Sequence, residues 1–160
     1  MTKYQRYFLL REDATQSYQA NGRSRKGVDP KEKIRLKYYF DLLETYTYSF
    51  KRVEFDREVR IEGMTGLADI VVFADDKKTK PFIVVECSPK GFSTTIFNNA
   101  LRQAILKARF LKATYAVCLT ETKKRTVMMR LGEDKDAVYV PVQDIPMAFA
   151  ERSEGAITNS

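Results

Sequence analysis

The chain contains no histidine and no tryptophan, and only two cysteines among its 160 residues. The absence of histidine excludes Ser–His and Cys–His nucleophile pairs, histidine general bases and most zinc sites. Cys87 and Cys118 each lie inside an apolar run, where a free thiol behaves as a small hydrophobic group, and neither has the spacing of a metal ligand. Any catalysis by this chain must therefore use carboxylates and lysines.

Long hydrophobic runs are also missing. The longest, around residues 70–74, is far too short to cross a bilayer. The basic residues at the N-terminus are not followed by the apolar segment of about 7–15 residues that a secretory signal requires. We therefore expect a cytoplasmic protein with no membrane contact, and the chain length predicts a single domain.

Positive charge is in excess, with a formal net charge of +7 and a pI near 9.4. This favours an anionic partner, and nucleic acid is the first candidate, although many basic proteins carry solvated lysines and bind nothing. The candidate nucleic-acid contacts lie in a Gly-flanked N-terminal loop and in two later loops: Arg23, Arg25, Lys26, Lys90, Lys123, Lys124 and Arg125.

A capping box predicts where the first helix begins. Asp29 is the N-cap, Pro30 occupies the first helical position, where its missing N–H costs nothing, and Glu32 closes the box. Apolar residues then recur every four positions as far as about residue 45, which predicts an amphipathic helix packed on a sheet.

Three strands are predicted next. Residues 52–61 alternate between polar and apolar types, as a half-exposed strand does. Residues 67–74 and 82–87 are apolar on both faces, which is typical of the central strands of a helix-covered sheet. The charged residues 75–81 between them predict a hairpin connection, so these two strands should be antiparallel neighbours.

Apolar residues repeat at spacings of four and three between residues 97 and 111 and predict a second amphipathic helix. Its polar side carries Asn99, Gln103 and Lys107 in one column. A buried strand at 114–120 and shorter strands at 126–131 and 137–140 follow.

The resulting order has an α-β-β-β-α-β core, which predicts an α/β fold with a mixed β-sheet flanked by helices. We predict a domain at residues 29–149. An N-terminal extension with the basic loop, residues 1–28, would precede it, and a flexible tail, residues 150–160, would follow.

Two acidic residues interrupt the apolar central strands. Burying a carboxylate is costly unless it is paired, hydrogen-bonded or bound to a cation, and the predicted hairpin brings Asp69 and Glu86 to the same end of the sheet. Oxygen ligands without histidine or cysteine suit Mg²⁺ or Mn²⁺. The alternative is that each carboxylate pairs with an arginine or lysine from a flanking element.

Together these features resemble the N-terminal nuclease domain of type I restriction enzyme R subunits, in its short stand-alone form, which belongs to the PD-(D/E)XK nuclease superfamily. The resemblance covers about residues 25–120. It implies a restriction-endonuclease-like fold and Mg²⁺-dependent hydrolysis of phosphodiester bonds in DNA. It rests on the helix opening at 29–35 with Tyr38 and Tyr39, on Glu58, and on the acidic strand motifs at 68–72 and 84–87.

The resemblance also implies roles for particular residues. Asp69 would be the metal-binding aspartate and Glu86 the glutamate of the Glu-X-Lys motif, with the carbonyl of Cys87 completing the inner metal shell. Glu32 matches the acidic residue of the first helix that often supports the site. Gln103 matches the glutamine of the Gln-X-X-X-Tyr helix motif.

Two positions depart from the family pattern. The lysine of the strand motif is Ser88 here, and the tyrosine of the helix motif is Lys107. Ser88 cannot supply the positive charge that orients the attacking water and stabilises charge on the phosphate. Lys107, one helical turn beyond Gln103, or Lys90 could supply it instead. The alternative for Lys107 is a solvated surface lysine.

The leading hypothesis from the sequence is a metal-dependent DNA endonuclease of the restriction or DNA-processing type. A catalytically impaired nuclease fold that acts as a nucleic-acid-binding or assembly module is the second. A plain α/β protein whose basic charge only aids solubility is the third. Cleavage of both DNA strands would favour a homodimer, but no motif indicates one.

Overall fold

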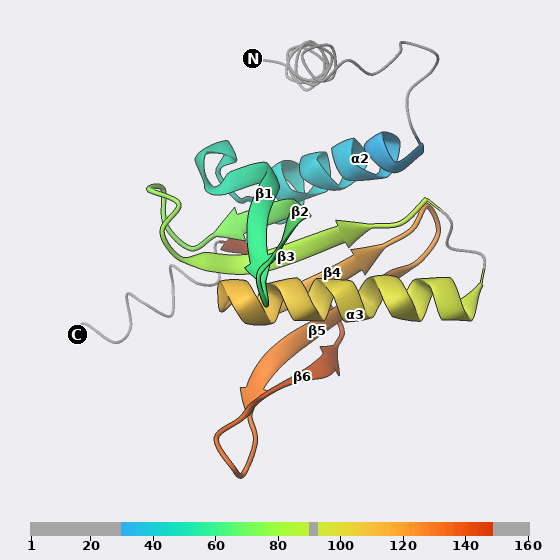
Figure 1. The fold of residues 1–160 in the computed structure, drawn as a ribbon. Helices are drawn as coiled ribbons and strands as arrows, with labels where there is room; N and C mark the ends of the chain where they lie inside the picture. The colour runs from blue at the N-terminus through green and yellow to red at the C-terminus, as the bar shows by residue number, and fades with distance from the viewer. Residues whose placement is uncertain (1–29, 90–92, 149–160) are drawn as a thin grey trace.

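In the computed structural model, which describes residues 30–89 and 93–148, one mixed sheet separates two long helices (Figure 1). This is the α/β arrangement with helices on both faces that the sequence predicts. The elements in chain order are α2 (Pro30–Glu44), the 3-10 helix η1 (Phe50–Arg52), β1 (Val53–Ile61), β2 (Met64–Phe73), β3 (Pro81–Cys87), α3 (Thr94–Leu111), β4 (Tyr115–Leu119), β5 (Lys124–Leu131) and β6 (Ala137–Val142).

The strands lie side by side in chain order, from β1 to β6. The pair β3 and β4 is parallel, and every other neighbouring pair is antiparallel. A parallel pair needs a crossover connection, and α3 provides it between β3 and β4. The predicted antiparallel pairing of the two central acidic strands, β2 and β3, is confirmed.

Each face of the sheet has its own hydrophobic core. On one face Leu42 of α2 belongs to a cluster with Ile70 and Val85, and on the other Ala108 of α3 belongs to a cluster with Val84 and further residues of β2 and β4. Successive side chains of a strand point to opposite faces, so β2 and β3 contribute to both cores. This explains why their sequences are continuously apolar, and why an acid within them is unusual.

The first turn of α2 is fixed to β1 by an ion-pair relay. Arg35 donates from Nη2 to Glu32 Oε2 at 2.6 Å and from Nη1 to Asp56 Oδ1 at 2.7 Å. The guanidinium also lies over the ring of Phe55, 5.1 Å from its centroid. Glu32 and Arg35 therefore determine where the start of α2 lies on the sheet. The predicted N-cap, Asp29, is outside the described residues.

The strand limits differ from the prediction at the turn between β1 and β2. The apolar pattern predicts a second strand from residue 67, but β2 begins at Met64, which pairs directly with Ile61. The two turn residues, Glu62 and Gly63, both have positive φ, at 49° and 83°. A two-residue turn of this kind matches the twist of paired strands, and it lets the ladder continue to the end of the hairpin.

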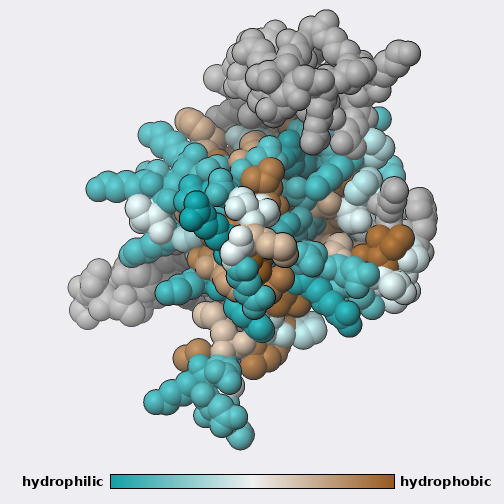
Figure 2. All heavy atoms as spheres, viewed as in Figure 1, coloured by the Kyte–Doolittle hydropathy of each residue, from teal (hydrophilic) through white to brown (hydrophobic). Residues whose placement is uncertain are grey.

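The surface seen in Figure 2 is mainly hydrophilic, with hydrophobic side chains in small groups between charged ones. Within the described ranges no helix has the length and apolar character needed to span a bilayer. Cys87 and Cys118 are both free and buried, as the sequence predicts for small hydrophobic groups. Burial raises the pKa of the Cys118 thiol to about 12.

Candidate active site

Asp69 and Glu86 lie opposite each other where the ladder between β2 and β3 ends. Its last pair at this end is Ile70 with Val85, so Asp69 and Glu86 occupy the next step. Asp69 Oδ2 accepts a hydrogen bond of 2.8 Å from the backbone N–H of Cys87. Both acids are buried, with 4% and 7% exposure. The predicted juxtaposition at one end of the sheet is therefore observed.

A lysine from each flanking helix reaches one of the two acids. Lys31 Nζ of α2 lies 2.9 Å from Asp69 Oδ1. Lys107 Nζ of α3 lies 2.6 Å from Glu86 Oε1 and donates to the backbone oxygen of Leu67 at 2.7 Å. This is the lysine pairing that the sequence analysis gave as the alternative to a bound cation. It also places two ammonium groups beside the acid pair.

The electrostatics of the site disfavour two negative charges. Burial, followed by the charge of Asp69, raises the pKa of Glu86 to about 7, although Lys107 opposes the shift. Burial lowers the pKa of Lys31, but the hydrogen bond to Asp69 and the charges of Asp69 and Glu86 outweigh it, and the net pKa is raised. Lys31 therefore stays protonated, and the acid pair favours additional positive charge.

The raised pKa of Glu86 predicts an unusual dependence of stability on pH. Between the ordinary carboxyl value and about 7, the folded chain binds a proton at Glu86 that the unfolded chain has lost. This contribution to the free energy of unfolding is therefore complete below about pH 4.5 and is lost as the pH rises through about 7. Urea unfolding of the wild type and Glu86→Gln between pH 5 and pH 8 measures it. The wild type should lose stability relative to the variant until about pH 7, and a constant difference would contradict the assignment.

Among the described residues, no hydrogen bond or ion pair joins the other residues predicted for the site to the acid pair. Gln103 is exposed, and no hydrogen bond between described residues joins it to Asp69 or Glu86. The Glu32 carboxylate binds Arg35. Ser88 is half-buried, and its backbone N–H donates to the oxygen of Leu119 at 2.8 Å. The site roles inferred for Gln103 and Glu32 stay predictions.

The candidate nucleic-acid contacts are divided between described and undescribed parts of the chain. Lys123 lies in the turn after β4, while Lys124 and Arg125 open β5. Lys124 Nζ donates to Tyr46 Oη at 2.8 Å and pairs with Asp144 Oδ1 at 3.2 Å. Four of the predicted contacts lie outside the described residues: Arg23, Arg25, Lys26 and Lys90.

Lys31 has no predicted role from the sequence. It directly follows Pro30 in the first turn of α2, and no periodicity or motif in the sequence relates it to a strand that begins more than thirty residues later. Its contact with Asp69 depends on how α2 crosses the sheet, which is a tertiary property. Predicting this contact would have required knowing that Arg35 joins Glu32 of α2 to Asp56 of β1, because these ion pairs set the position of the start of α2 on the sheet.

The acid pair has the donor set of a magnesium or manganese site with few protein ligands. No group of three or more acidic, cysteine or histidine side chains suited to a metal occurs among residues 30–89 and 93–148. Mg²⁺ is commonly bound through one or two carboxylates while water and substrate phosphates complete its shell. Asp69, Glu86 and the carbonyl of Cys87 fit that pattern.

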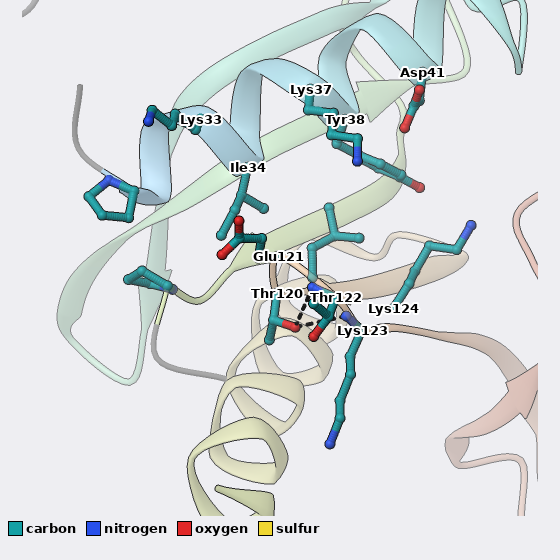
Figure 3. Close-up of a pocket in the computed structure, with 13 residues that line it drawn as sticks. Lys33, Ile34, Lys37, Tyr38, Asp41, Thr120, Glu121, Thr122, Lys123 and Lys124 are labelled. Atoms are coloured by element: carbon teal, nitrogen blue, oxygen red, sulfur yellow. Dashed lines mark hydrogen bonds between the residues drawn. The ribbon is translucent and has the colours of Figure 1, made fainter. Parts of the chain in front are cut away.

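A groove of about 540 Å³ lies beside the acid pair, between α2 and the turn that joins β4 to β5. Figure 3 shows Lys33, Lys37 and Tyr38 on the α2 wall, opposite Lys123 and Lys124. The groove begins next to the site, because its lining includes Pro30, which precedes Lys31, and Pro89, which lies two residues after Cys87. Four lysines and two acids line it: Lys33, Lys37, Lys123, Lys124, Asp41 and Glu121.

The Tyr38 hydroxyl in this groove is buried and has no hydrogen-bond partner among the described residues. A buried polar group without a partner is costly, so a polar ligand or water at this position would be stabilised. The groove therefore combines an excess of positive charge with a polar group that has no hydrogen-bond partner among the described residues.

Comparison with known proteins identifies one family. The profile described as "Type I restriction enzyme R protein N terminus (HSDR_N)" matches residues 30–146, which is most of the chain. No curated protein and no solved structure matched the chain. The family match covers every helix and strand of the sheet domain described above, including Asp69, Glu86, Lys31 and Lys107. The chain belongs to the family of type I restriction enzyme R protein N-terminal domains.

Proposed function

We propose that this protein is a metal-dependent endonuclease that hydrolyses phosphodiester bonds in DNA, in a restriction or DNA-processing role. The observation that carries the proposal is the buried pair Asp69 and Glu86, where the ladder between two neighbouring strands ends, in a member of a restriction-enzyme family. Buried acids with a strongly perturbed pKa cluster at functional sites. The PD-(D/E)XK assignment belongs to the same proposal.

Asp69, Glu86 and the carbonyl of Cys87 would hold the cation, Mg²⁺ or Mn²⁺. When bound, such an ion supplies a nucleophilic hydroxide and neutralises charge on the scissile phosphate. Neighbouring groups hold the two carboxylates in position for such an ion. The N–H of Cys87 orients the Asp69 carboxylate, and Lys107 fixes the Glu86 carboxylate and binds the backbone oxygen of Leu67 in β2.

The basic groove would guide one DNA strand toward the acid pair. Changing Lys33 and Lys37 together to glutamine should weaken DNA binding, because each exposed lysine neutralises a phosphate and releases counterions. The slope of log affinity against log salt concentration should become less negative by about two. Fluorescence anisotropy with a labelled duplex in Ca²⁺ measures both effects.

Lys77 and Lys80 provide the matched control for the groove. Both are exposed in the connection between β2 and β3, at the far end of these strands from the acid pair. Changing them to glutamine removes the same charge. Equal losses of affinity in the two double variants would rule out the groove as the DNA path.

A nuclease fold that binds nucleic acid without cleaving it is the second candidate, and Ser88 is the observation that favours it. The two functions are separated by incubating supercoiled plasmid with the purified chain and Mg²⁺ or Mn²⁺. Nicked or linear product that disappears with Asp69→Asn supports the endonuclease, whereas binding without product supports the second candidate. Linear product would further indicate that two sites act together, as in a homodimer.

A further inference from the structure

The candidate site needs a positive group other than the cation, and its usual position holds Ser88. Developing charge on the phosphate is stabilised best by groups already aimed at it. Two lysines in the described part of the site could serve, Lys31 from α2 and Lys107 from α3. They come from helices on opposite faces of the sheet and differ in accessibility, with side chains that are 41% and 14% exposed.

Lys107 is held in place. Its side chain is only 14% exposed and makes two short contacts, to Glu86 and to the backbone oxygen of Leu67. Turning the ammonium toward a substrate would leave Glu86 buried without its partner, which is costly. Lys107 is therefore suited to positioning Glu86 and to joining α3 to β2, and it is poorly suited to contacting a substrate.

Lys31 has the properties that Lys107 lacks. Its side chain is 41% exposed, its Nζ lies 2.9 Å from Asp69, and it is the chain neighbour of Pro30, which lines the groove. The backbone of this turn is fixed by the contacts of Glu32 and Arg35, so a flexible side chain extends from a rigid base. A phosphate bound at Asp69 would therefore lie beside an accessible ammonium group.

We propose that Lys31 contacts the scissile phosphate in place of the missing strand lysine, and that Lys107 acts as a positioning residue for Glu86. This rests on the proposed function, because it assigns a role within the same site. A cation on the Asp69 carboxylate would release the Lys31 ammonium to the phosphate. The negative charge that develops on the phosphate oxygens would then be stabilised by a group that can stay in contact throughout the reaction.

The test compares Lys31→Met, Lys31→Arg and the distant control Lys77→Met in two assays on the full chain. The first is the rate of plasmid cleavage at saturating DNA with Mg²⁺. Lys31→Met should lower this rate by about 100-fold, and Lys31→Arg should recover most of it, because arginine keeps the charge. Lys31→Met removes a partner of the buried Asp69, so some loss of melting temperature is expected, and circular dichroism at the assay temperature checks that each variant is folded. Cleavage by Lys31→Met within about threefold of the wild type would overturn the assignment.

The second assay measures duplex binding in Ca²⁺, where no cleavage is needed, and it separates this inference from the proposed function. Lys31→Met should weaken binding on the order of tenfold, while Lys77→Met should not. If the wild type cleaves no DNA, the endonuclease proposal fails and this assay alone decides whether Lys31 contacts phosphate. Unchanged affinity in Lys31→Met would then refute the contact.

Discussion

Asp69→Asn should reduce DNA cleavage by about 1,000-fold or more. The charge stabilisation that a catalytic metal provides is worth several kcal/mol, and each 1.36 kcal/mol corresponds to about tenfold in rate. The asparagine side chain has nearly the same shape and can still accept the hydrogen bond from the N–H of Cys87. The loss should therefore come from the missing charge. Conversion of supercoiled plasmid in Mg²⁺, followed over time, measures it.

Asp76→Asn is the matched control. Asp76 is an exposed aspartate at the other end of β2, where its carboxylate pairs with Arg52 at 2.9 Å. This variant should cleave at the wild-type rate. Circular dichroism of both variants tests whether the fold is retained, and full cleavage by folded Asp69→Asn would contradict the proposed site.

Lys107→Met should give the largest loss of stability among single changes at the site. Removing one partner of a buried ion pair costs about 3–5 kcal/mol, because the other charge remains buried. Here the remaining charge is Glu86, which is 7% exposed. The loss should be greatest at pH 8, where Glu86 is ionised, and smaller at pH 5, where burial favours its protonated form. Urea unfolding at the two pH values measures both effects.

Two further variants show whether the pair itself is responsible. Glu86→Gln combined with Lys107→Met removes both charges and should recover much of the stability at pH 8. Arg102→Met removes a charge from an exposed position of the same helix and should have little effect. A loss that is independent of pH and persists in the double variant would indicate a packing defect at Lys107.

Most of the sheet domain could be predicted from local patterns. The start of α2 at Pro30 agrees with the predicted helix opening, and the fourfold spacing of apolar residues in α2 and the doubly apolar strands follow from periods that the backbone imposes. The hairpin connection between β2 and β3 was also enough to bring Asp69 and Glu86 together. When a short connection joins two antiparallel strands, few registers are possible, so the relative position of the two acids is nearly determined.

The lysines around the acids could be predicted only in part. The spacing of Gln103 and Lys107 indicates a shared side of α3, but it does not determine how far each side chain reaches. In the structure Lys107 contacts Glu86, while Gln103 is exposed. Lys31 could not be predicted, because its contact with Asp69 depends on the packing of α2 across the sheet.

The basic groove is a second feature that depends on tertiary structure. Its lysines come from α2 and from the turn after β4, which are more than eighty residues apart. The sequence analysis identified Lys123 and Lys124 as candidate contacts from local charge alone. Lys33 and Lys37 gave no such signal, since a charged face is normal for an amphipathic helix.

The proposed function requires Asp69 and Glu86 to hold a divalent cation together. A crystal structure of the protein soaked in Mn²⁺, with anomalous scattering data, tests it directly. We expect one anomalous peak within coordination distance of both carboxylates and of the Cys87 carbonyl, with Lys31 displaced from Asp69. The absence of a peak at saturating Mn²⁺, with Lys31 and Lys107 still paired to the two acids, would contradict the claim.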